Sequence, residues 1–235
     1  DSTQDVAFRL AQKEAPEGTL VVAEEQVLGR GRLGRPYFCP LGGLWFSLIL
    51  RPPLRPQLSV PITLMAGVAV AEGLKDATGL RTTLKWPNDV LIRGRKVAGI
   101  LTEMVAETDV VRFAICGIGV NANIEKGSFP SEWGSAATSL MMELGQEVYR
   151  AALLCRILES LDRHYSSLIL QGPQVVLDAW RQWPNMLGKR IRVTSGRDQV
   201  EGTAVEIDGQ GALIVRMKEG KVERVVAGDV HVAEV

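Results

Sequence analysis

Four apolar segments follow one another in the middle of the chain, and too few residues separate them for helices to lie between. They cover residues 82–86, 90–92, 96–105 and 110–116. Short apolar runs bounded by Gly, Asn and Asp are typical of β-strands, and Arg93-Gly94-Arg95 predicts a tight turn between the second and the third. We therefore expect a β-sheet at the centre of the fold.

Helices and further strands are predicted on either side of these segments. Strands are expected at 19–23 and 44–50, and a helical pattern follows the polar residues at the start of the chain. The three longer helical patterns lie at 59–79, 147–170 and 175–183. Strands in one region and helices in others favour an α+β fold.

The C-terminal part of the chain has a different pattern. Its short alternating segments lie at 190–193, 200–207, 212–217 and 222–226. Several short strands separated by Gly-containing turns predict a small β-barrel. We expect a boundary between Asn185 and Gly188, with one domain over 1–186 and a second over 187–235.

The charge balance limits the class of partner. Lys plus Arg and Asp plus Glu both number 27, so the formal net charge is +0. A domain that binds nucleic acid is usually much more basic, so DNA binding is not expected. The apolar stretch 60–71 is far shorter than the roughly 20 residues of a membrane span. Without a leader-like start, the cytoplasm is the expected location.

The three cysteines have no metal-like spacing. Cys39, Cys116 and Cys155 are separated by long stretches, and the last two lie in apolar contexts. We expect them to be small buried hydrophobic residues in a reducing compartment.

Two glycine runs fit the pattern of a dinucleotide-binding loop. Residues 29–34 fit G-x-G-x-x-G, and residues 117–122 fit G-x-G-x-x-A. Such a site needs a helix that begins inside the motif and directs its amides at the pyrophosphate. Neither run is followed by a helical pattern, so we reject this interpretation for both.

Two other segments carry residues suited to anions. Arginines alternate with glycines at 29–35, where a guanidinium could bind phosphate or carboxylate, although a solvated basic turn is the simpler alternative. Lys85-Trp86-Pro87-Asn88-Asp89 joins two strands, and its last two side chains could face a hydrated magnesium ion beside phosphates. The alternative is an Asn-Asp turn with a packed tryptophan.

The order and spacing of these motifs closely resemble the biotin–protein ligase family. The matching segments are Ser2-Thr3, Gln26, 29–35, 85–89, 95–101 and 117–121. The resemblance implies a mixed sheet with flanking helices, related to class II aminoacyl-tRNA synthetases, and an SH3-like C-terminal domain. Gln4, where asparagine is common, and Tyr37, where tryptophan is common, depart from the family pattern.

The resemblance also implies roles for particular residues. The biotin-binding residues would be Ser2, Thr3, Gln4, Gln26, Arg30, Gly31, Arg32, Lys96 and Gly99. The ATP-binding residues would be Arg32, Tyr37, Lys85, Asn88, Asp89 and Asn121, with Asp89 facing the metal. Lys96, at the biotin carboxylate, and Arg32 would be the catalytic residues. The glycine-rich loop would become ordered over biotin and the adenylate.

The implied activity is ATP-dependent ligation. Biotin and ATP would give biotinyl-AMP and pyrophosphate, with Mg²⁺ as cofactor, and biotin would pass to a lysine of a biotin carboxyl carrier protein. The resemblance favours a homodimer, and no DNA-binding domain is expected before the catalytic part. A lipoate ligase or octanoyltransferase, a nucleic-acid-binding module and a biotin-binding pseudoenzyme are the alternatives.

Overall fold

The computed structural model describes residues 1–56, 59–196 and 198–232. Within them, a six-stranded sheet has the order β1-β2-β6-β5-β4-β3. Its strands are β1 (Leu20–Ala23), β2 (Leu44–Leu50), β3 (Thr83–Lys85), β4 (Asp89–Ile92), β5 (Arg95–Glu107) and β6 (Val110–Val120). All six were expected, although β6 extends beyond its predicted end because its apolar character continues through the glycines at 117 and 119.

Every strand pair in this sheet is antiparallel, so the expected mixed sheet was wrong in strand direction. Short turns join β3, β4, β5 and β6, and such turns can connect only antiparallel neighbours. Arg93 and Gly94 both have positive φ, which confirms the tight turn between β4 and β5.

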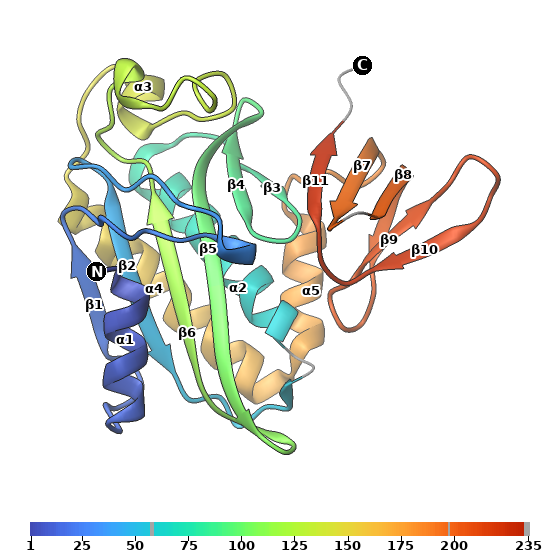
Figure 1. Cartoon of the computed structure of the whole chain (residues 1–235), viewed down its shortest axis with the longest axis horizontal. Helices are drawn as coiled ribbons and strands as arrows, with labels where there is room; N and C mark the ends of the chain where they lie inside the picture. The colour runs from blue at the N-terminus through green and yellow to red at the C-terminus, as the bar shows by residue number, and fades with distance from the viewer. Residues whose placement is uncertain (57–58, 197, 233–235) are drawn as a thin grey trace.

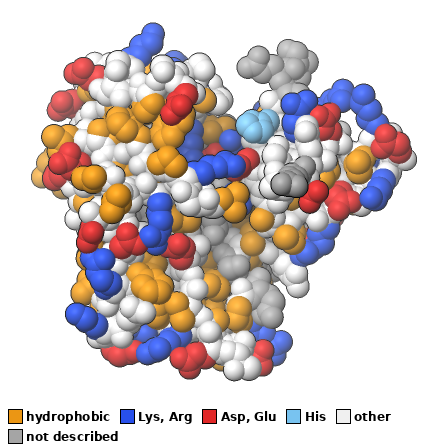
Figure 2. Space-filling view, viewed as in Figure 1, with side chains coloured by type: hydrophobic (Ala, Val, Ile, Leu, Met, Phe, Trp, Pro, Cys, Tyr) orange, Lys and Arg blue, Asp and Glu red, His pale blue; other side chains and the backbone are white. Residues whose placement is uncertain are grey.

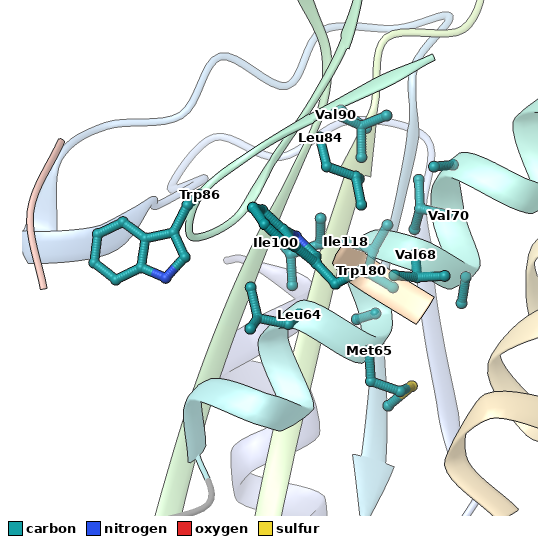
Figure 3. Close-up of a cluster of buried hydrophobic side chains, with 14 of the residues drawn as sticks. Leu64, Met65, Val68, Val70, Leu84, Trp86, Val90, Ile100, Ile118 and Trp180 are labelled. Carbon is teal, nitrogen blue, oxygen red and sulfur yellow. The ribbon is translucent and has the colours of Figure 1, made fainter. Parts of the chain in front are cut away.

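Helices cover both faces of the sheet (Figure 1). Helix α1 (Thr3–Gln12) lies in front of it, where Ala7 and Ala11 pack against Ile49 and Phe113. Helices α2 (Ser59–Thr78), α4 (Arg150–Gln171) and α5 (Pro173–Gln182) lie behind it and share the main core. In Figure 3, Leu64 and Val68 of α2 face Ile100 and Ile118 of the sheet.

The predictions for α4 need two corrections. The helix begins three residues later than expected, and a short helix α3 (Leu140–Leu144), which the sequence did not predict, precedes it. Cys155 was expected to be buried but is exposed, because the buried stripe of α4 runs through Leu153 and Ile157 instead. Cys39 and Cys116 are buried as predicted.

The C-terminal part forms a separate five-stranded antiparallel sheet in the order β10-β9-β8-β7-β11. Its strands are β7 (Arg190–Ser195), β8 (Asp198–Ile207), β9 (Leu213–Arg216), β10 (Val222–Val225) and β11 (Asp229–Val232). β11 was not predicted, because only four residues of alternating pattern mark it. It pairs antiparallel with β7 and forms one edge of this sheet.

The two sheets are joined through a continuous hydrophobic core. Val193 and Leu213 of the smaller sheet belong to the same buried cluster as α2 and α5. Polar contacts add to it: the indole of Trp86 donates a hydrogen bond to the carbonyl of Gly211 at 2.8 Å. Among the described residues, no helix is long and apolar enough to span a bilayer.

Candidate active site

A cavity of about 610 Å³ opens where the large sheet meets the smaller one. It is lined by the start of α1, the loop before β2, the turn between β3 and β4, the first part of β5, the last part of β6, and the segment 228–231. Figure 2 shows basic and acidic side chains gathered in the recess between the larger and the smaller part of the molecule.

Glycines on neighbouring strands form the floor of this cavity. Gly99 of β5 lies opposite Gly119 of β6. A Cβ atom at Gly119 would lie 2.6 Å from the ring of Tyr37, and one at Gly117 would lie 2.4 Å from Oε1 of Gln4. The glycines therefore let the site's side chains lie flat on the sheet. This explains the second glycine run, which continues a strand and begins no helix.

The first turn of α1 places three polar residues at one end of the cavity. Ser2 caps the helix by accepting a hydrogen bond from the amide of Asp5 at 3.1 Å, and Thr3 Oγ1 lies 2.9 Å from Ser47 Oγ. Both residues are buried. The amides at a helix N-terminus attract electron-rich groups, so this end suits a neutral polar head group.

Gln26 faces the same end of the cavity. Its Oε1 accepts a hydrogen bond from the amide of Thr3 at 2.6 Å, and its Nε2 donates to Cys39 Sγ at 3.1 Å. Burial raises the pKa of the Cys39 thiol to about 12, so the sulfur is a neutral acceptor. Gln4 is less available to a ligand, because its carboxamide already bonds Ser47, Glu103 and the carbonyl of Ile115.

The arginine–glycine loop folds back on itself, since the amide of Gly31 donates a hydrogen bond to the carbonyl of Arg35 at 2.8 Å. A single 3-10 turn, η1 (Arg32–Gly34), lies within it. Arg30 forms ion pairs with Asp5 and Glu103. Arg32 donates hydrogen bonds to Asn88 Oδ1 at 3.3 Å and to the carbonyl of Gly228 at 3.1 Å. Each guanidinium of the loop therefore has acceptors within the protein, and the ordering of the loop over biotin and the adenylate stays a prediction.

Two lysines share one buried carboxylate at the other end of the cavity. Lys96 Nζ lies 2.5 Å from Asp89 Oδ1, and Lys85 Nζ lies 2.9 Å from Asp89 Oδ2. Burial would raise the pKa of Asp89, but the two ammonium groups outweigh burial and lower it below its usual range. Lys96 also lies 5.5 Å from the centre of the Tyr37 ring. The cavity thus presents two fixed positive charges to an anion.

This carboxylate does not fit a protein-held magnesium site. Both oxygens of Asp89 are taken by ammonium groups. Across the described ranges, no group of three or more His, Cys, Asp or Glu side chains could hold a metal ion. Magnesium usually keeps several waters and is bound through one or two carboxylates together with substrate phosphates, so Asp89 would hold it only jointly with the phosphates of ATP.

Comparison with known proteins agrees with this geometry. Residues 1–121 match the Biotin/lipoate A/B protein ligase family, and residues 186–232 match the Biotin protein ligase C terminal domain. A relative from Bacillus subtilis, named bifunctional ligase/repressor BirA, is 40% identical over 98% of this chain and 71% of its own length. The chain belongs to the biotin protein ligase family.

Other relatives and solved structures support this membership. A biotin–[acetyl-CoA-carboxylase] ligase from Paracoccus denitrificans is 33% identical over 94% of this chain and 93% of its own length. A biotin protein ligase from Aquifex aeolicus, solved in complex with biotin and ATP, superposes with a TM-score of 0.84 and 28% identity. The superposition covers 100% of this chain and 96% of the Aquifex chain.

Within this biotin protein ligase fold, most of the predicted site residues line one cavity. They are Ser2, Thr3, Gln4, Gln26, Arg30, Gly31, Arg32, Tyr37, Lys85, Asn88, Asp89, Lys96 and Gly99. Asn121 is not among the lining residues. Its buried amide donates to the carbonyls of Thr138 and Lys96, so it joins β6 to neighbouring segments. The prediction that Asn121 lines the nucleotide pocket stays a prediction.

The cavity also has walls that sequence reasoning missed. Trp133 lines it from the segment before α3, and Ser47 lines it from β2. Asp229 and His231 reach it from the smaller sheet. No local pattern marks these positions, because they lie in an irregular segment or far along the chain, and only folding brings them to the site.

Proposed function

We propose that this chain is an ATP-dependent biotin–protein ligase. The observation that supports this proposal most directly is one cavity with polar groups at one end and the Lys96–Asp89–Lys85 cluster at the other. A ligand with a neutral polar ring at one end and a carboxylate at the other would fit the two ends of this cavity. The names of the Paracoccus and Aquifex proteins supply the chemical identity, biotin and ATP.

In this proposal, Ser2, Thr3 and Gln26 hold the ureido head group of biotin at the start of α1. Gln4 supports Ser47 behind them, which is a more indirect role than the direct contact expected from the sequence. The valeryl tail lies along the glycine floor and brings the carboxylate to Lys96. Arg30 and Gly31 carry the loop over the ring, while Gly99 leaves room for the tail.

ATP is proposed to lie beside Arg32, Tyr37, Lys85 and Asn88, with its α-phosphate facing the biotin carboxylate. One carboxylate oxygen attacks the α-phosphorus, the bond to the bridging oxygen breaks, and pyrophosphate leaves. Fixed positive charges in a closed cavity stabilise charge that develops on the phosphate. Lys96 and Arg32 are the proposed catalytic residues. Mg²⁺ would accompany the phosphates of ATP without protein ligands sufficient to hold it alone.

The second step transfers biotin to a carrier protein. The neutral ε-amine of a carrier lysine attacks the acyl carbon of biotinyl-AMP, and AMP leaves with the pair of electrons from the broken C–O bond. Until then the mixed anhydride must be kept from water. The loop at 29–35 is placed to do this, since it already lies along the cavity.

Several finer features belong to the same proposal. We propose that the large sheet and its helices are class II synthetase-like, that the small sheet is SH3-like, and that the domains are 1–186 and 187–235. We also propose a biotin carboxyl carrier protein as acceptor, a homodimer and a cytoplasmic location. Free cysteines are consistent with a reducing compartment.

An ATP–pyrophosphate exchange assay tests the first step. Labelled pyrophosphate should enter ATP when biotin and Mg²⁺ are present, and not when biotin is omitted. Because the matched family also includes lipoate ligases, lipoate is the essential comparison. Equal exchange with lipoate would replace the proposed substrate, and binding of biotin without exchange would indicate a pseudoenzyme.

A further inference from the structure

The loop over the cavity is fastened to the small C-terminal sheet. Arg35, at the end of the loop, forms an ion pair with Asp229 at the start of β11. Arg32 reaches the adjacent residue and donates a hydrogen bond to the carbonyl of Gly228 at 3.1 Å, across 196 positions of sequence. Two successive residues of the small sheet therefore hold two arginines of the loop.

The backbone at Gly228 is built for this contact. Its φ is +155°, and a Cβ atom there would lie 2.7 Å from Cγ1 of Val193 and 3.0 Å from the carbonyl oxygen of Thr194. Glycine lets β11 begin close against β7, and this close packing fixes the Gly228 carbonyl and the Asp229 carboxylate on a rigid strand pair. The loop is therefore held by a sheet, and not by another loop.

The two contacts differ in strength. The side chain of Arg35 is 60% exposed and that of Asp229 is 28% exposed, so water and salt weaken this ion pair. Arg32 is more buried, and this burial lowers the pKa of its guanidinium, an effect that Asp229 and Asp89 only partly offset. The ion pair between Arg35 and Asp229 can thus break while the hydrogen bond from Arg32 to Gly228 persists. A reversible fastening requires this difference.

We propose that Asp229 is a positioning residue that keeps the loop closed over biotinyl-AMP. It acts through Arg35 and touches no reacting atom. The small sheet would then set how long the adenylate stays enclosed before a carrier lysine reaches it. This role rests on the proposed function, whereas the fastening itself can be measured without any ligand.

The fastening is tested by hydrogen–deuterium exchange of residues 29–35 in the ligand-free protein. Asp229→Asn should speed exchange by about two- to fivefold, the range expected from loss of one exposed ion pair. Glu201→Gln is the matched control, because it removes the negative charge that pairs with Arg192 in the same sheet, an ion pair that includes no residue of the loop. It should leave loop exchange unchanged.

Two further arms make this measurement specific. Salt at 1 M, where the screening length is about 3 Å, should bring the parent protein close to Asp229→Asn and change that variant little. Reversing the pair with Arg35→Glu and Asp229→Arg together should restore slow loop exchange. Unchanged loop exchange in Asp229→Asn would overturn the fastening.

The functional role is read from adenylate retention. Enzyme loaded with biotinyl-AMP and freed of excess ligand should release it about two- to fivefold faster as Asp229→Asn than as the parent. Faster loop exchange without faster release would overturn the role in retention. A parent protein that makes no adenylate would overturn the proposed function and this role together, while the exchange data would still decide whether the loop is fastened.

Discussion

At the scale of single residues, Lys96 and Arg95 are neighbours on β5 that bind different acids. Lys96 Nζ lies 2.5 Å from Asp89 in the cavity, whereas Arg95 Nη2 lies 2.5 Å from Glu143 of α3. A hydrogen bond involving a charged group contributes about 1.5–3 kcal/mol. We expect Lys96→Ala to slow single-turnover biotinyl-AMP formation by roughly one to two orders of magnitude, at about 1.4 kcal/mol per tenfold. Lys96→Arg should rescue it only partly, because a guanidinium has a different shape.

Arg95→Ala is the matched control and should show the opposite pattern. The Glu143 side chain is 0% exposed, so loss of a partner should lower the free energy of unfolding by about 1–3 kcal/mol while adenylation stays near the parent rate. Lys96→Ala should retain its fold, since Lys85 still neutralises Asp89. Chemical denaturation and single-turnover kinetics on both variants separate the two effects. A slower adenylation step in Arg95→Ala than in Lys96→Ala would contradict the assignment of Lys96.

At the scale of elements, the paired strands β5 and β6 form the cavity floor because they carry glycines there. Gly119→Ala would place a methyl group 2.6 Å from Tyr37 and 3.2 Å from Trp45. Overpacking of this kind costs about 1–3 kcal/mol, and moving Tyr37 narrows the cavity. We expect calorimetry to show biotin affinity reduced by about tenfold or more, consistent with that cost at 1.4 kcal/mol per tenfold. Gly127→Ala, whose methyl group would enter open space, should bind biotin as the parent does.

At the scale of the whole molecule, the small sheet is part of the main core. Val193, Leu213 and Val230 lie in the same buried cluster as α2 and α5, and Arg181 of α5 donates to the carbonyl of Ile207 at 2.6 Å. A chain truncated after Leu187 would expose the apolar surface that these residues cover. We therefore expect it to melt at a clearly lower temperature and to lose biotin affinity. The change to short alternating segments after residue 187 instead suggests that the C-terminal part is dispensable for biotin binding. A truncated chain that melts and binds biotin like the parent would support that independence.

The sequence by itself determined most elements and most members of the site. Strand segments, the Arg93–Arg95 turn and the motif order were predicted correctly, because periodicity, turn residues and motif spacing depend on residues close together in the chain. Thirteen of the site residues implied by the family resemblance line one cavity, because the motifs that carry the resemblance keep their order and spacing along the chain.

Only the tertiary structure decided how these pieces meet. The antiparallel pairing of the large sheet, the burial of Asp89 between two lysines and the structural role of Asn121 all depend on register between strands. The contact of Arg35 with Asp229 depends on how the small sheet docks. A side chain's partner is set by packing between distant segments, and the residues beside it in sequence carry no record of that packing.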